Sequence, residues 1–343
     1  MKRFSKLFAL ILILFLFTFP LYAQENQPIH LAILHINDFH GRLLPYIDKS
    51  INEKIPVGGA AYLAKMIQVE KAKNSEGTLL LSAGDMFQGT PVSNIFHGQP
   101  VIEAMNYLKF DAMAIGNHEF DWGQDVSKDL FAKAYFPFLS ANIVDGQGRY
   151  LSGVKPYIMI ERKGLKIAII GITTIETSYT TKPDNVKGLA FLKPEKVLSE
   201  LIREVRDHGA NLVIVLSHSG FDSDKQFTEN VQGIDIIVGG HSHTVVINPA
   251  VVRKTIVVQA GYNGIYMGVL ELTIQPETKH ILEFTREREI KTVFAGPDNK
   301  FDEKVTQIVN TYNDKLKEAF SKVVGETTVD LVRNHQFISS PSM

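Results

Sequence analysis

Histidine and aspartate side chains recur in five short motifs of this sequence, and each motif directly follows an apolar run. The motifs are Asn37-Asp38-Phe39-His40-Gly41, Gly84-Asp85, Gly116-Asn117-His118-Glu119-Phe120-Asp121, Ser217-His218 and Gly239-Gly240-His241-Ser242-His243. Carboxylate, amide and imidazole donors without any thiolate suit Zn²⁺, Mn²⁺, Fe or Mg²⁺. The sequence therefore predicts a metal centre with oxygen and nitrogen ligands.

Each motif taken alone also has an ordinary structural explanation. An Asp-x-His pair or a Gly-Asp pair is common turn chemistry, and His218 could be a hydrogen-bonded core histidine. Asn117 could cap a helix. His241 and His243 would point to opposite faces of a strand, so both could bind one centre only if the chain turns there. The occurrence of all five motifs after apolar runs favours a single site over five accidents.

The apolar runs are predicted to be buried β-strands. They are rich in Val, Ile and Leu and mostly lack strict alternation, which is typical of strands buried on both faces. The predicted strands are 31–36, 78–83, 111–115, 138–141, 166–172, 211–216, 234–238 and 255–260. Because ligands of α/β proteins bind at the carboxyl ends of strands, five of these strands would deliver the motifs to one place.

Amphipathic stretches between the strands predict helices at 59–73 and 194–208. The second begins with Pro194 and stops before Gly209, which are typical start and stop signals. Residues 157–160 and 165–170 are predicted to form a hairpin, and 268–274 alternates as a strand. The pattern indicates an α/β chain with mixed sheets.

The two ends of the chain differ from this pattern. Basic residues 1–6, an apolar run of eleven at 7–17 and a small residue, Ala23, predict a secretory signal cut after residue 23. The alternative is an uncleaved membrane anchor, but the apolar run is short against the roughly 20 residues that span a bilayer. Near the other end, Phe301 to Phe320 predicts a long amphipathic helix, and 323–331 resembles a strand.

Composition excludes several classes of protein. The chain has 343 residues and no Cys, which rules out a thiol nucleophile, Cys-ligated zinc and a lipid anchor on cysteine. With 36 basic and 37 acidic residues there is no positive surplus, so we expect no nucleic acid polymer as partner. The signal and the absence of any later spanning segment predict an exported protein, periplasmic or extracellular, with no stable membrane anchor.

We expect two metal ions, because one carboxylate can bridge two cations about 3.5–4 Å apart. The expected ligands are Asp38, His40 and His243 for one ion, Asn117, His218 and His241 for the other, and Asp85 shared between them. His118 is left over beside Asn117 and would face the substrate.

The motifs together resemble the secreted 5′-nucleotidase / UDP-sugar hydrolase family of calcineurin-like metallophosphoesterases. The blocks at 37–41, 84–85, 116–121 and 239–243 match in order, and the resemblance spans residues 29 to about 290. It implies a four-layer α/β/β/α sandwich, the metal ligands above and two divalent ions, whether Zn, Mn, Co, Fe or Mg. It also implies that His118, oriented by Asp121, is catalytic and that Asn117 and His118 contact the substrate. At the His243 position relatives carry an amide or a histidine.

The implied reaction is hydrolysis of a small-molecule phosphate ester, most simply release of phosphate from a nucleotide by a metal-bridging hydroxide. Alternatives are a 2′,3′-cyclic phosphodiesterase, a thiosulfate-ester hydrolase and, from another class, a non-catalytic metal-binding fragment. The expected domains are a signal peptide at 1–23, a catalytic domain at 24–295, a linker helix at 296–322 and, at 323–343, a remnant of the start of a C-terminal nucleotide-binding domain.

Overall fold

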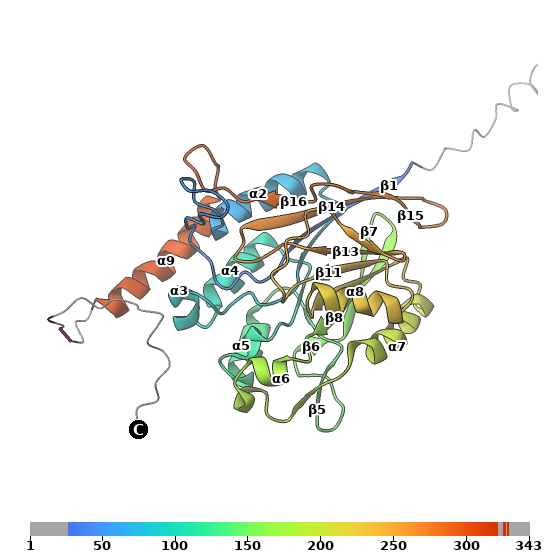
Figure 1. Ribbon diagram of the computed structural model, residues 1–343, viewed down its shortest axis with the longest axis horizontal. Coiled ribbons are helices and arrows are strands. Elements are labelled where there is room, and N and C mark those ends of the chain that lie inside the picture. Colours follow the sequence, from blue (N-terminus) through green and yellow to red (C-terminus); the bar gives the residue numbers. More distant parts are fainter. Residues whose placement is uncertain (1–26, 322–324, 327, 329–343) are drawn as a thin grey trace, which may run out of the picture.

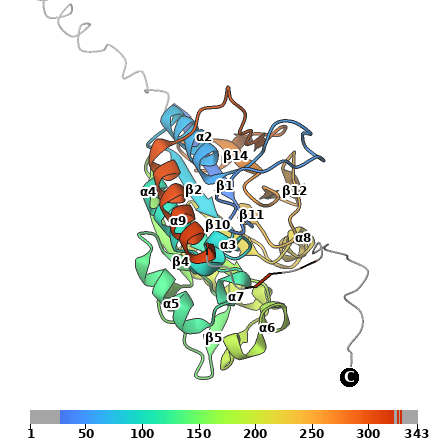
Figure 2. The ribbon, with the colours of Figure 1, turned by 90° about the vertical axis from the view of Figure 1, so that its left-hand side faces the viewer.

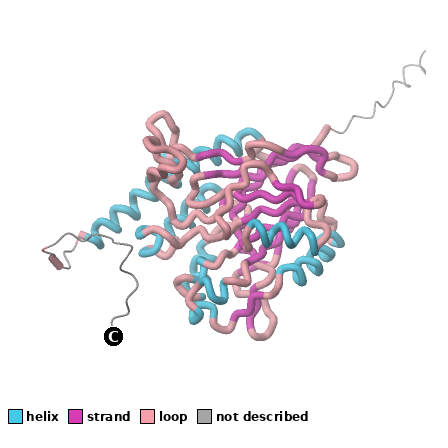
Figure 3. The backbone as a smooth tube through the Cα atoms, in the orientation of Figure 1, coloured by secondary structure: helices cyan, strands magenta, loops and turns pink. Residues whose placement is uncertain are grey.

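Two β-sheets packed face to face form the centre of the molecule, and helices cover their outer faces (Figure 1, Figure 3). The computed structural model describes residues 27–321 together with 325, 326 and 328. The described part holds three apolar cores: one between the sheets and one between each sheet and its helices. This arrangement confirms the expected four-layer α/β/β/α sandwich.

The first sheet has eight strands, in the order β15-β14-β1-β2-β3-β4-β6, with β16 also paired to β14. The strands from β1 to β6 run parallel, whereas β14 is antiparallel to β1. Their bounds are β1 Ile29–Ile36, β2 Thr78–Ser82, β3 Ala112–Ala114, β4 Phe138–Leu139, β6 Val154–Lys155, β14 Tyr266–Ile274, β15 Ile281–Phe284 and β16 Ile290–Thr292.

The second sheet has six strands, in the order β12-β13-β11-β10-β8-β7, and its four central strands are parallel. Their bounds are β7 Tyr157–Arg162, β8 Leu165–Thr173, β10 Leu212–His218, β11 Ile236–Gly239, β12 Ala250–Val252 and β13 Thr255–Gln259. β7 and β8 form the predicted hairpin. A separate small sheet pairs β5 (Ile143–Asp145) with β9 (Leu189–Phe191).

The helices divide between the two outer faces, as Figure 2 shows for α2, α4 and α9 on the first sheet. On that side lie α2 (Ala60–Lys73), α3 (Pro91–Ile95), α4 (Gln99–Leu108), α5 (Gln124–Lys133) and α9 (Glu303–Phe320). The second sheet is covered by α7 (Pro194–Asp207) and α8 (Phe221–Asn230). Three short helices complete the described chain: α6 (Thr177–Thr180), η1 (His118–Phe120) and η2 (Pro183–Val186).

Within the described residues, the predicted strands and all three predicted helices are present, with shifted ends. The largest functional difference is that β10 continues to His218, because its pairing with β8 extends as far as Thr173. His218 is therefore the last residue of a strand and not part of a loop. Helices α4, α5 and α8 were not predicted, and the strand expected at 323–331 falls largely outside the described residues.

Helix α9 packs on the same core as α2 and α4, where it buries Val305, Val309 and Tyr312. Asp302 caps its first turn by accepting a hydrogen bond from the Val305 N–H at 2.7 Å. The Asp302 carboxylate also accepts one from Gln68 of α2, at 2.6 Å. The helix expected to be a linker is thus docked on the first sheet. Within the described residues no helix is both long and apolar enough to cross a bilayer.

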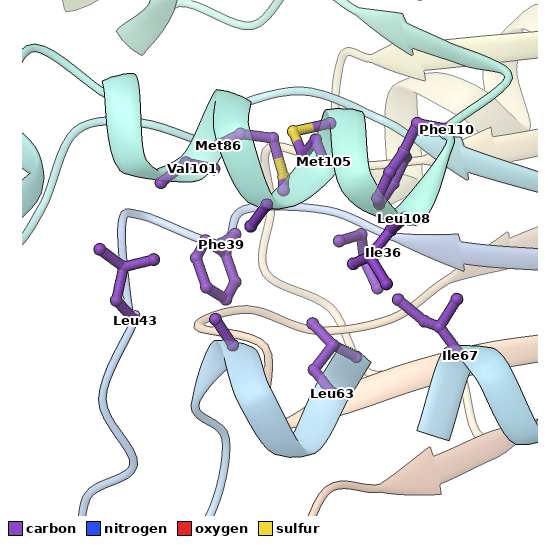
Figure 4. A pocket seen from close by; sticks show the side chains of 12 residues that line it. Ile36, Phe39, Leu43, Leu63, Ile67, Met86, Val101, Met105, Leu108 and Phe110 are labelled. Atoms are coloured by element: carbon purple, nitrogen blue, oxygen red, sulfur yellow. The ribbon is translucent and has the colours of Figure 1, made fainter. Parts of the chain in front are cut away.

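Two apolar residues next to predicted ligands point into the core between α2 and α4. Figure 4 shows Phe39 and Met86 among the side chains that fill this space, between Leu63 of α2 and Met105 of α4. Phe39 is 3% exposed and Met86 is 1% exposed. Burial of these apolar side chains anchors the loops that present the polar residues on either side of them.

Candidate metal centre

The carboxyl ends of β1, β2 and β3 in the first sheet meet those of β10 and β11 in the second sheet. A hydrogen bond at 2.9 Å from the His241 N–H to Asp38 Oδ2 joins the loops after β11 and β1. Another, from the His118 N–H to Asp85 Oδ1, also at 2.9 Å, joins the loops after β3 and β2. The structure therefore brings the predicted motifs together at one edge of the sandwich.

The first group of candidate ligands is Asp38, His40 and His243, whose ligand atoms all lie within 4.8 Å of one another. Nε2 of His243 is 3.3 Å from Asp38 Oδ1 and 3.1 Å from Nε2 of His40. The His243 ring stacks on Tyr262 with centroids 5.0 Å apart. His243 has the most exposed side chain of the three, at 42%.

The second group is Asp85, His218 and His241, again with ligand atoms within 4.8 Å. Nε2 of His218 lies 2.9 Å from Asp85 Oδ2, and both side chains are buried. Burial alone would raise the pKa of Asp85, but attraction to His218 outweighs it and holds the pKa below its usual range. Asp85 also accepts the His40 N–H on its carbonyl at 3.1 Å, so it lies beside the first group as well.

Hydrogen bonds to main-chain carbonyls orient two of the histidines. Nδ1 of His40 is 2.9 Å from the carbonyl oxygen of Gln88, and Nδ1 of His218 is 2.6 Å from that of Ala83. A carbonyl oxygen can only accept a hydrogen bond, so Nδ1 carries the proton in each neutral ring. Nε2 then carries the lone pair that could bind a metal ion. Such a partner fixes the tautomer of a metal-binding histidine.

Five candidate ligands have a left-handed backbone conformation, which residues other than glycine rarely adopt. They are Asp38, His40, Asp85, His241 and His243, with φ between 50° and 74°. Residues held in this region cluster at functional sites, where surrounding contacts maintain them. Positive φ at His241 and His243 makes the chain turn there, so both rings can face the centre.

Gly240 allows the two sheets to approach at the second group. A Cβ at this position would lie 2.7 Å from the carbonyl oxygen of Ala83 and 2.9 Å from Nδ1 of His218. Both distances are shorter than the contacts that real Cβ atoms make. The Ala83 oxygen belongs to the main chain and cannot move aside as the end of a flexible side chain could. Only glycine therefore fits between the loops that carry His218 and His241.

Two buried oxygen atoms at the centre have no hydrogen-bond partner: Oδ1 of Asp38 and Oδ1 of Asn117. Asn117 precedes η1, but its side chain makes no capping hydrogen bond, so the capping alternative does not explain it. Burying an unsatisfied oxygen costs free energy unless another group binds it. Because both atoms belong to predicted ligands, the donor set fits divalent cations.

His118 and Asp121 form a pair beside the two groups. Nδ1 of His118 is 2.6 Å from Asp121 Oδ2, and the His118 ring lies 5.3 Å from that of His40. Burial opposes protonation of His118, but the hydrogen bond to Asp121 and the charge of Asp85 raise its pKa to about 9. The imidazole can therefore hold a proton at neutral pH.

Several residues with a role in the geometry were not predicted. Glu119 accepts three main-chain N–H bonds, from Asp85, Met86 and Gly116, and thereby ties the loop after β2 to the loop after β3. Asn37 donates to Asp38 Oδ2 at 2.7 Å and to the carbonyl of Gly261 at 2.6 Å. Asn37 and Glu119 lie within the motifs at 37–41 and 116–121, and their closeness in sequence to the expected ligands is the only feature that could have indicated their roles.

The Asp121 carboxylate is held from the other side by the segment that follows β8. Oδ1 of Asp121 accepts a hydrogen bond from the Thr181 hydroxyl at 3.0 Å, and the Asp121 carbonyl accepts one from Asn185 at 2.8 Å. The sequence carries no signal for these two residues, because they are about sixty positions from Asp121.

Comparison with known proteins identifies the family. The family model of calcineurin-like phosphoesterases matches residues 31–245, which contain all the motifs that converge here. The chain belongs to the calcineurin-like phosphoesterase family. It is 32% identical over 335 residues to a 5′-nucleotidase of Rattus norvegicus, a match that covers 88% of this chain and 55% of that protein.

Two further proteins that this chain resembles are also described as 5′-nucleotidases. A probable 5′-nucleotidase of Treponema pallidum is 35% identical over 218 residues, which cover 62% of this chain and 36% of that protein. Among solved structures, a 5′-nucleotidase precursor from Thermus thermophilus superposes with a TM-score of 0.77 at 30% identity, covering 89% of this chain and 62% of that one. The chain spans about half the length of the rat relative.

Proposed function

We propose that this chain hydrolyses phosphate esters with two divalent cations and that its substrates are nucleotides, from which it releases phosphate as a 5′-nucleotidase does. The observation that carries the proposal is the pair of ligand groups, the second of which contains Asp85, with His118 beside them. Similarity to 5′-nucleotidases supports the nucleotide as substrate.

In this proposal Asp38, His40 and His243 would hold one ion and Asn117, His218 and His241 would hold the other. Asp85, which the structure groups with His218 and His241, would be shared between them. The oxygen and imidazole donors suit Zn, Mn, Co, Fe or Mg. When bound, two such ions polarise the phosphoryl oxygens and lower the pKa of water.

The side chains of this chain supply orientation and a proton. Asn117 and His118 bind the phosphoryl group, and protonated His118 stabilises the charge that grows on the equatorial or leaving oxygen in the transition state. Asp121 accepts the Nδ1–H of His118 and keeps Nε2 directed to the substrate, at a pair distance of 2.6 Å. No carboxylate is needed as a general base.

A substrate panel on the purified chain tests the proposal. With added Mn²⁺, we expect phosphate release from AMP to exceed turnover of bis(p-nitrophenyl) phosphate, 2′,3′-cyclic AMP and a thiosulfate ester. Preference for a diester would favour the cyclic phosphodiesterase, and preference for the thiosulfate ester would favour the thiohydrolase. No turnover of any ester by a chain that holds two ions would favour a non-catalytic metal-binding fragment.

We further propose that the protein is exported to the periplasm or the cell exterior. The basic, apolar and small residues at 1–23 support this, as does the family of secreted enzymes that the motifs resemble. The proposed domains remain a signal peptide at 1–23, a catalytic domain at 24–295, a linker helix at 296–322 and the start of a nucleotide-binding domain at 323–343. Accessibility of the protein to added protease in intact cells tests the location.

A further inference from the structure

Glu176 makes a direct contact with one candidate ligand from a part of the chain that no motif includes. It lies just before α6, in the segment that follows β8, and its Oε2 is 3.0 Å from Nε2 of His241. The side chain of His241 is 19% exposed and that of Glu176 is 46% exposed. The pair therefore lies at the rim of the centre and not in the core.

This contact determines which nitrogen of His241 is free. A carboxylate accepts, so the proton of the neutral imidazole resides on Nε2 and the lone pair on Nδ1. His40 and His218 are bonded the opposite way, because their Nδ1 atoms donate to carbonyls and their Nε2 atoms face other candidate ligands, His243 and Asp85 respectively. His241 differs from these two histidines because its Nε2 is held by a carboxylate outside the ligand set, which leaves Nδ1 as the atom that could bind metal.

We propose that Glu176 is a positioning residue that holds His241 in its metal-binding tautomer and strengthens it as a ligand of the second ion. This inference rests on the proposed function, since it requires that the second group binds a cation. A carboxylate on the far nitrogen of a ligand histidine fixes the ring and raises its basicity, and its loss typically costs 10- to 100-fold in metal affinity.

The same segment provides a contrast. Thr181, five residues beyond Glu176, donates to Asp121 and so acts on His118, which is not a ligand in this proposal. Two neighbouring substitutions should therefore have different consequences: one should change metal affinity and the other should change only turnover.

The experiment measures Mn²⁺ binding to the purified chain after removal of metal with a chelator. We expect two sites in the unchanged chain. Glu176→Gln should weaken one site about 10- to 100-fold and leave the other within two-fold. Glu176→Ala should weaken the same site more, because the glutamine amide oxygen can still accept the His241 N–H and alanine cannot. Turnover of Glu176→Gln should recover towards the unchanged value as Mn²⁺ is raised.

Two controls separate this effect from a loss of structure. Glu195→Gln changes another carboxylate that lines the same surface pocket, and it should leave both sites unchanged. Thr181→Val should lower kcat without changing either affinity. The metal-free Glu176→Gln variant should unfold within a few degrees of the unchanged chain, since Glu176 is half-exposed.

Unchanged affinity at both sites in Glu176→Gln would overturn the inference, as would an equal loss at both sites or a large fall in the metal-free unfolding temperature. An unchanged chain that binds fewer than two ions would instead overturn the proposed function, and this inference with it. The two failures can be told apart, because the first is observed in Glu176→Gln and the second in the chain without substitution.

Discussion

The imidazole of His218 donates from Nδ1 to the carbonyl of Ala83 across 2.6 Å. His218 ends β10 in the second sheet, and Ala83 follows β2 in the first sheet. This bond therefore joins the carboxyl ends of the two sheets directly beneath the candidate metal centre. The orientation of a ligand depends on how the sheets pack, and so substitutions that separate the sheets should affect metal binding.

Gly240→Ala tests this dependence. The added methyl group would meet the Ala83 carbonyl and the His218 ring, so we expect the variant to bind metal at least about 10-fold more weakly and to lose 1–3 kcal/mol of unfolding free energy. Metal titration and chemical denaturation measure the two effects. Gly146→Ala, where a Cβ would meet nothing within 4 Å, is the matched control and should change neither.

His118→Asn tests the division between ligands and catalytic residues. Because His118 contributes a proton and not a metal bond in this account, kcat should fall by roughly 10²–10⁴ while both ions remain bound. Metal content and phosphate release are measured on the same sample, with the exposed His208→Asn as control. Loss of metal together with activity would make His118 a ligand and contradict the assignment.

Glu119→Gln tests the support of the shared aspartate. Both carboxylate oxygens of Glu119 accept main-chain N–H bonds, so an amide would place an NH₂ group against at least one N–H. We expect a loss of about 1–3 kcal/mol in unfolding free energy and weaker binding of both ions. Glu229→Gln, on the exposed surface of α8, should stay within about 0.5 kcal/mol. Equal stability of the two variants would contradict the account.

Asp224 predicts a pH dependence of stability. Burial raises the pKa of its carboxyl to about 8, although the Ser217 hydroxyl donates to it at 2.6 Å. The folded state then holds the proton more tightly than the unfolded state, so this group should destabilise the fold progressively as pH rises from about 4 to 8. Asp224→Asn cannot titrate, so it should not lose stability in this way as the pH rises.

Thermal unfolding of Asp224→Asn and the unchanged chain at several pH values measures the effect. We expect the difference in Tm, variant minus unchanged chain, to increase by several degrees between pH 5 and pH 8. A difference that stays constant with pH would show that Asp224 does not titrate in this way.

The strands and their terminal motifs could be predicted because local patterns determine them. Apolar runs rich in Val and Ile indicate buried strands, and the polar residues after each run mark its end. The end of β10 was placed two residues early, since pairing with Thr173 of β8 and not local composition decides where that strand stops.

The residues that orient the ligands could not be predicted from local patterns. Glu176 is 65 positions from His241, and nothing in its own sequence surroundings indicates that contact. Asn37 and Glu119 lie inside recognised motifs, yet their roles depend on main-chain groups that only the folded sheets bring near. Contacts between the two sheets therefore determine this part of the centre.

The central claim is that Asp85 is shared by two cations, and the number of ions bound per chain tests it most directly. Titration of the metal-free chain with Mn²⁺ should give two ions per chain, and Asp85→Asn should weaken both sites by at least about 10-fold, while the exposed Asp125→Asn should bind two normally. Binding of at most one ion by the unchanged chain, or loss of only one site in Asp85→Asn, would contradict the account.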